Sequence, residues 1–101
     1  MPFLSGHEDV QMEEIRWIEA AGESVCLHTA RGSRIVRQTL EEVERELDAV
    51  EFIRVHESAI VRREQVRGLR MLSGGDGIVE MDGGAEVRVG HKYFSGLDSW
   101  G

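Results

Sequence analysis

Glycine spacing constrains this chain more than any other feature of its sequence. Glycines typical of turns punctuate it, at Gly6, Gly22, Gly32, Gly74, Gly75, Gly77, Gly83 and Gly84. Turn signals that recur about every ten residues are typical of chains built from short strands. The short connections exclude most crossovers between parallel strands, which need roughly a dozen residues or more. The spacing therefore predicts short antiparallel strands.

Alternating apolar residues place these strands. Three are predicted at residues 15–19, 24–29 and 33–37, and turns at Gly22 and Gly32 join them into a meander. In the second, Val25 and Leu27 form the apolar side, and Cys26 falls on the polar side. Further strands are predicted at residues 52–55, 59–61, 66–72, 78–81 and 85–89, with turns at 56–58, 73–77 and 82–84. The aromatic tail, residues 93–100, is expected to pack back on the sheet.

One segment has the period of a helix instead. Leu40, Val43 and Leu47 lie at i, i+3 and i+7, which predicts a short amphipathic helix over residues 40–47. Thr39 and Glu42 form the pattern of a capping box before it. Its outer face is mostly glutamate, so we expect a solvated surface that is poorly suited to a DNA groove. Together the segments predict a mainly β fold, an elongated stack of short antiparallel sheets with about eight to ten strands and one helix.

Length and composition bound the class of protein. The 101 residues fit one domain, over residues 1–101. A single cysteine, Cys26, excludes an intrachain disulfide, and the first residues do not resemble a secretion signal. No apolar run approaches the roughly 20 residues that a membrane helix needs. We therefore expect a cytoplasmic protein with no membrane partner.

Charge gives a mixed indication about nucleic acid. The net charge of −7 argues against it, because phosphate neutralisation needs local positive charge. Arginines nevertheless cluster along the chain, at Arg31, Arg34 and Arg37 and again at Arg54, Arg62, Arg63, Arg67 and Arg70. Arginine suits bidentate contacts with phosphate and guanine, although codon bias explains such enrichment equally well.

Patterns for catalysis or metal binding are weak. Cys26 and His28 lie two apart on one strand face and could hold a metal only with help from elsewhere, so a buried thiol beside a histidine is the favoured interpretation. Ser58 and His56 lack an orienting acid, and residues 74–77 lack the Lys-Ser/Thr of a phosphate loop. We expect no enzyme, no metal and no cofactor. One acidic helix also leaves a helix-turn-helix unsupported.

Several ordered motifs resemble one family. Residues 14–27 (EIRWIEAAGESVCL) are similar to its first signature, and residues 39–47 are similar to its helix. The strongest signature, Phe-x-Arg-x-His-x-Ser-x-Ile-Val, is met at Phe52, Arg54, His56, Ser58, Ile60 and Val61. Val66 and a closing segment at residues 87–93 also match. From about residue 3 to residue 97 the chain resembles the LytTR family, the DNA-binding output domains of many bacterial response regulators.

The resemblance implies that loops between strands enter successive major grooves at paired direct repeats upstream of regulated genes. Three loops correspond to the family's: residues 21–25, residues 56–58 extending to Arg62, and residues 90–93. The residues that the resemblance implies for DNA binding are Gly22, Glu23, Ser24, Val25, Arg54, His56, Glu57, Ser58, Arg62, Arg63, His91, Lys92 and Tyr93.

Departures from the family pattern fall in these loops. Gly22-Glu23-Ser24 replaces Gly-Asn-Tyr, Glu57 replaces Arg, Lys or Asn, and Arg62 replaces Asn. Gly90-His91-Lys92 replaces Ser-Arg-Arg/Lys. A glutamate can accept a hydrogen bond from cytosine N4, but elsewhere it repels phosphate.

Two functions stay open. The first is sequence-specific binding of double-stranded DNA and transcriptional regulation. The second is a LytTR-like module that has lost DNA binding and acts as an interaction or antagonist domain. A homodimer, a regulator partner, a free-standing module and an excised piece of a longer protein all remain compatible with the sequence.

Overall fold

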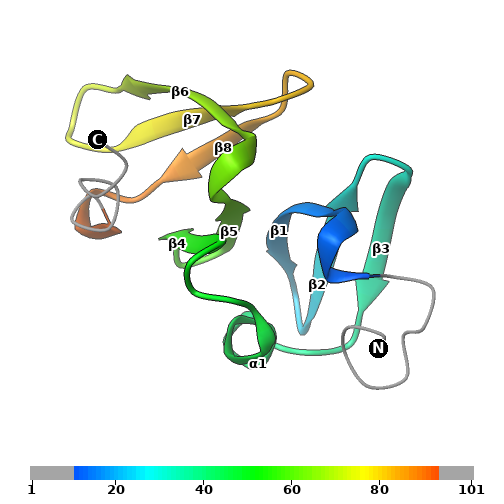
Figure 1. Cartoon of the computed structure of the whole chain (residues 1–101). Helices are drawn as coiled ribbons and strands as arrows, with labels where there is room; N and C mark the ends of the chain where they lie inside the picture. Colours follow the sequence, from blue (N-terminus) through cyan, green and yellow to red (C-terminus); the bar gives the residue numbers. More distant parts are fainter. Residues whose placement is uncertain (1–10, 94–101) are drawn as a thin grey trace.

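The computed structural model describes residues 11–93, and over this range it is mainly β, as the sequence predicts (Figure 1). Its eight strands are β1 (Ile15–Ala21), β2 (Ser24–Thr29), β3 (Gly32–Val36), β4 (Phe52–His56), β5 (Ala59–Arg62), β6 (Val66–Met71), β7 (Gly77–Met81) and β8 (Glu86–Val89). One α-helix, α1 (Leu40–Glu46), follows β3. Three short 3-10 turns complete the described chain, η1 (Met12–Glu14), η2 (Arg63–Gln65) and η3 (His91–Tyr93).

The strands form two antiparallel sheets. The first contains five strands in the order β3-β2-β1-β5-β4, and the second contains three in the order β6-β7-β8. In Figure 1 the β4–β5 hairpin lies between the meander β1–β3 on one side and the second sheet on the other. The principal-axis extents are 41 × 24 × 22 Å, which agrees with the elongated stack that we expected.

Each face of the five-stranded sheet supplies one hydrophobic core. On one face, Ile15, Ile18, Leu27 and Ile60 pack against Leu40 and Val43 of α1 in a cluster that also includes Val25, Val36 and Phe52. On the other face, Val55, Ala59 and Val61 pack against Val79, Met81, Val87 and Val89 of the second sheet. The β4–β5 hairpin therefore contributes to both cores, and its position is set from two sides.

Helix α1 begins with the predicted capping box. The Glu42 N–H donates to Thr39 Oγ1 at 3.1 Å, and the Thr39 N–H donates to Glu42 Oε1 at 2.8 Å. The helix ends at Glu46, one residue earlier than predicted, because Leu47 is already extended with ψ 150°. Its glutamates lie on the exposed side, whereas Leu40 and Val43 are buried.

Strand bounds differ from the prediction by one or two residues. β1 continues to Ala21, where the pair Ala21–Ser24 closes the hairpin, and β3 begins at Gly32, which pairs with Thr29. Beyond Tyr93, the aromatic tail lies outside the described residues. Within residues 11–93, no helix is long and apolar enough to cross a membrane.

Candidate nucleic-acid interface

The first loop is the tight turn between β1 and β2. Ala21 pairs with Ser24, so Gly22 and Glu23 alone connect the strands. Gly22 has φ +66°, in the left-handed region that favours glycine. Glu23 is exposed and Ser24 is half-buried. Val25 is fully buried in the first core, so its side chain is part of the fold and not of a binding surface.

The second loop is the β4–β5 turn at residues 56–58. His56 Nδ1 accepts a hydrogen bond from the Ser58 N–H at 3.1 Å, and Ser58 Oγ lies 2.9 Å from the same nitrogen. An accepting Nδ1 places the ring proton of a neutral His56 on Nε2. His56 is half-buried, and Glu57 and Ser58 are exposed at the tip. The turn thus fixes the histidine ring and presents Nε2–H as a donor.

Arg54 stabilises this turn through hydrogen bonds to its backbone. Its guanidinium donates to the carbonyl oxygens of His56 and Glu57, at 2.7 and 2.6 Å. It also binds the Glu44 and Glu41 carboxylates of α1, at 2.7 and 3.2 Å. The side chain is 14% exposed, so it supports the loop from inside. The family signature therefore places Arg54 where it ties α1 to the second loop.

The third loop follows β8 and contains η3. The Gly90 N–H donates to Val55 O at 2.8 Å, which attaches the loop to β4. Asp76 accepts from the His91 N–H at 3.1 Å and lies 3.4 Å from His91 Nδ1. The pKa of Asp76 is lowered, first by the backbone hydrogen bond from His91 and also by the neighbouring cations. Asp76 thus positions the loop, although it lies 15 residues earlier in the chain and no sequence pattern marks it.

The third loop makes an ion pair with the second. Lys92 Nζ lies 2.6 Å from Glu57 Oε1, and both side chains are exposed. The hydrogen bond and the charge of Lys92 lower the pKa of Glu57, and Glu57 in turn raises the pKa of Lys92. The Glu57 carboxylate therefore binds the Lys92 ammonium group as an anionic phosphate oxygen would.

The three loops are neighbours in space. The Ala20 N–H donates to Ser58 O at 2.8 Å, which joins the end of β1 to the second loop. The Glu57–Lys92 pair joins the second loop to the third. A cavity of about 260 Å³ between the second and third loops is lined by His56, Glu57, Asp76, Gly90, His91, Lys92 and Tyr93.

One of the expected arginines, Arg62, is buried. Arg62 is 4% exposed, and its guanidinium donates to the carbonyl oxygens of Ile15 and Met12. It also pairs with Glu51 at 2.9 Å and lies 4.4 Å from the centre of the Phe52 ring. Arg63 is half-buried, and its backbone N–H donates to the Glu51 carbonyl oxygen at 2.8 Å. Burial thus makes Arg62 a structural residue that joins η1, β1 and β5, which its charge alone does not reveal.

Most of the predicted arginine clusters are neutralised by carboxylates. Ion pairs at 4.0 Å or less join Arg31 to Glu14, Arg54 to Glu41 and Glu44, Arg62 to Glu51, Arg67 to Asp82, Arg70 to Glu80 and Glu86, and Arg88 to Asp76. Within residues 11–93, carboxylates therefore offset much of the positive charge in these runs. Lys92 supplies positive charge in the third loop, and Arg88 lies beside that loop through its ion pair with Asp76.

Comparisons with known proteins agree with this architecture. The family model described as the LytTr DNA-binding domain matches residues 6–101. A LytTr DNA-binding domain from Bacillus cereus superposes with a TM-score of 0.81 at 23% identity, covering 90% of this chain and 84% of that one. The CO-responsive transcriptional regulator RcoM of Rhodospirillum rubrum is 40% identical over 78 residues, 77% of this chain.

The matched segment is 33% of RcoM, so this chain spans about a third of that relative. The B. cereus domain shows that the fold is shared. The family model matches residues 6–101, which is nearly the whole chain, and so shows family membership as well. Family members are DNA-binding domains and not enzymes, which agrees with the expectation that His56 and Ser58 are not a catalytic pair. The chain belongs to the LytTR family of DNA-binding domains.

Proposed function

We propose that this chain binds double-stranded DNA in a sequence-specific manner and regulates transcription. The observation that carries the proposal is the row of three neighbouring loops, joined by the Ala20–Ser58 hydrogen bond and the Glu57–Lys92 ion pair. Family membership supports DNA as the partner, and RcoM is itself named a transcriptional regulator.

The contact surface that we propose is narrower than the set implied by the motifs. It comprises Gly22, Glu23, Ser24, His56, Glu57, Ser58, His91, Lys92 and Tyr93. Arg54 supports the second loop from inside, and the buried Val25 and Arg62 lie behind the surface. Donors such as His56 Nε2–H and Lys92 Nζ suit phosphate oxygens or guanine edges in a major groove.

Selection of bound sequences from random duplexes at two salt concentrations tests this proposal. We expect a preferred sequence, present as paired direct repeats, and an affinity that falls as salt rises. A chain that retards no duplex at low salt, from random or genomic DNA at micromolar protein, would contradict it. Mass measurement of the complex would show whether two chains occupy one repeat pair.

A second function has its own supporting observation. Glu57 already neutralises Lys92, Glu23 is exposed in the first loop, and at least six of the eleven arginines form ion pairs with acids. These features suit a LytTR-like module that has lost DNA binding and contacts another regulator. Glu57→Arg combined with Glu23→Asn discriminates the two. If the two glutamates only weaken the affinity for DNA, the double variant should bind DNA more tightly than the parent. If the chain is an interaction module, neither the parent nor the variant should bind DNA.

A further inference from the structure

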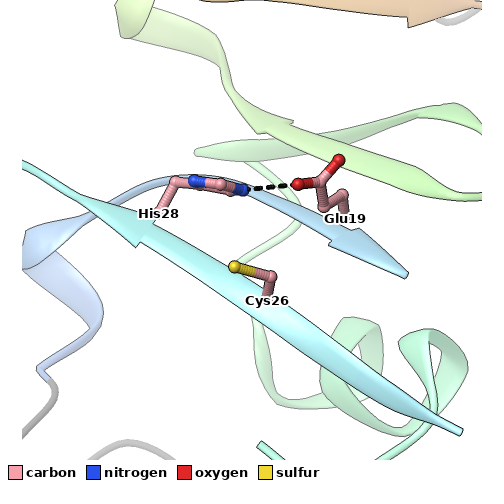
Figure 2. Close-up of side chains that lie close together, drawn as sticks. All are labelled: Glu19, Cys26 and His28. Carbon is pink, nitrogen blue, oxygen red and sulfur yellow. Dashed lines mark hydrogen bonds and ion pairs between the residues drawn. The ribbon is translucent and has the colours of Figure 1, made fainter. Parts of the chain in front are cut away.

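A cluster of three side chains lies on the face of the first sheet opposite α1. Glu19 of β1 pairs in register with Cys26 of β2, and His28 follows two residues later on the same side (Figure 2). The ligand atoms, a carboxylate oxygen, Sγ and a ring nitrogen, all lie within 4.8 Å of one another. His28 Nε2 is 2.8 Å from Glu19 Oε1. We propose that Glu19, Cys26 and His28 form a zinc site with an open fourth position for water.

The donor set suits zinc in type and in number. Zinc binds cysteine sulfur, histidine nitrogen and carboxylate oxygen, and sites with three protein ligands keep the fourth position for water. With a thiolate, a carboxylate and a neutral imidazole, the charge of Zn²⁺ is balanced. The soft thiolate disfavours magnesium and calcium, which prefer sites built from oxygen.

The distances also suit a tetrahedral ion. Bonds of about 2.0–2.3 Å to zinc place tetrahedral ligand atoms about 3.3–3.8 Å apart. The Glu19–His28 distance of 2.8 Å is shorter than this range, and no two ligand atoms are more than 4.8 Å apart. Rotation of the Glu19 side chain, which is 45% exposed, can bring its oxygen to this spacing. All three residues lie on the paired strands of one hairpin.

A hydrogen-bond partner on its other ring nitrogen orients the histidine. Ser33 Oγ of β3 lies 3.2 Å from His28 Nδ1. When Nδ1 carries the ring proton and donates it to Ser33, the lone pair of Nε2 is free for a metal. Metal-binding histidines usually donate their other N–H to such an oxygen, and loss of that partner typically costs about 10–100-fold in affinity. The Trp17 ring stacks on His28, with centroids 3.9 Å apart, and fixes the plane of the imidazole.

The site is accessible to solvent, and a metal bound there would cross-link two strands. The His28 side chain is 24% exposed, and Cys26 is 9% exposed, so solvent reaches the edge of the cluster. A metal there would join β1 to β2 across the hairpin whose turn is the first loop. The bound ion would therefore stabilise the β1–β2 hairpin. This inference concerns the sheet and does not depend on DNA binding.

Cobalt and zinc binding to the untagged, reduced chain test the site. Co²⁺ should give a thiolate-to-cobalt charge-transfer band in the near ultraviolet with a stoichiometry of one. Zn²⁺ should displace the Co²⁺, because zinc forms the more stable complexes. Co²⁺ is paramagnetic and should quench Trp17 fluorescence in a Trp100→Phe background. Zn²⁺ should raise the melting temperature of the chain.

Variants show whether these three residues are the ligands. Cys26→Ser should abolish the band, and Glu19→Gln and His28→Gln should each weaken zinc at least about tenfold. Ser33→Ala should weaken zinc by about 10–100-fold. The matched controls His56→Gln and His91→Gln, which change histidines outside the cluster, should bind zinc like the parent.

Three results would overturn the proposal. They are the absence of a band in the parent, a band that persists in Cys26→Ser, and unchanged zinc affinity in both Glu19→Gln and His28→Gln. Far-ultraviolet circular dichroism of each metal-free variant reports whether it folds. If Cys26→Ser does not fold, the zinc affinities of Glu19→Gln and His28→Gln, at the more exposed positions, decide whether the cluster binds zinc.

Discussion

Removing the Glu57 carboxylate should strengthen DNA binding, because Glu57 competes with phosphate for Lys92. The two groups are 2.6 Å apart, and both are exposed, so a phosphate can reach Lys92 once the glutamate is neutral. Glu57→Gln retains the shape of the side chain and removes its charge. Each additional phosphate contact makes the slope of log K against log salt more negative by about 0.9. One released lysine therefore makes the affinity difference between 50 and 200 mM salt larger by about 3.5-fold.

Fluorescence anisotropy with one labelled duplex across that salt range measures both the affinity and the slope. The control Glu80→Gln removes an equal charge in the second sheet, outside the loops, where Arg70 keeps its ion pair with Glu86, and should leave the slope nearly unchanged. Lys92→Gln in both backgrounds completes a double-mutant cycle, and the gain from Glu57→Gln should vanish without Lys92. An unchanged slope in Glu57→Gln, or an equal gain in the Lys92→Gln background, would refute the competition.

Three further predictions concern the scaffold and the ion pair. Arg62→Met leaves the Ile15 and Met12 carbonyl oxygens without their donor. It should therefore lower the free energy of unfolding by at least about 2 kcal/mol in urea denaturation. Phe52→Leu, which removes the ring beside the Arg62 guanidinium, serves as a comparison. Thr39→Ala removes the helix cap and should cost about 1 kcal/mol in the same assay, whereas Thr39→Ser should restore most of it. Lys92→Gln should raise the pKa of Glu57 toward its ordinary value of 4.5 in a carboxyl NMR titration, and an unchanged pKa would contradict the ion pair in solution. Because folding lowers this pKa, the ion pair stabilises the protein above pH 4.5, and the contribution is lost as pH falls through the lower folded value.

The secondary structure was predictable because its causes are local. Alternation in residues 24–29 and the glycine at position 22 define a strand and its turn within a few residues. Thr39 and Glu42 cap the helix by contacts three residues apart, so the sequence shows both partners. The family signature at residues 52–61 also marks the second loop, because its residues are close together in the sequence.

Tertiary structure decided the order of the strands and the roles of individual charges. β1 pairs with β5, and the contacts of Arg62 with Ile15 and of Lys92 with Glu57 span 47 and 35 residues. Arg62 and Lys92 are both cations in expected loops, yet one is buried in the scaffold and the other is exposed. Glu19 likewise joins Cys26 and His28 only through the antiparallel register of β1 and β2. The sequence by itself determined which segments are strands, helix and loops, because hydrophobic period and turn chemistry act over a few residues. The fold alone decided which charges meet, because burial of two cores brings together residues that no local pattern connects.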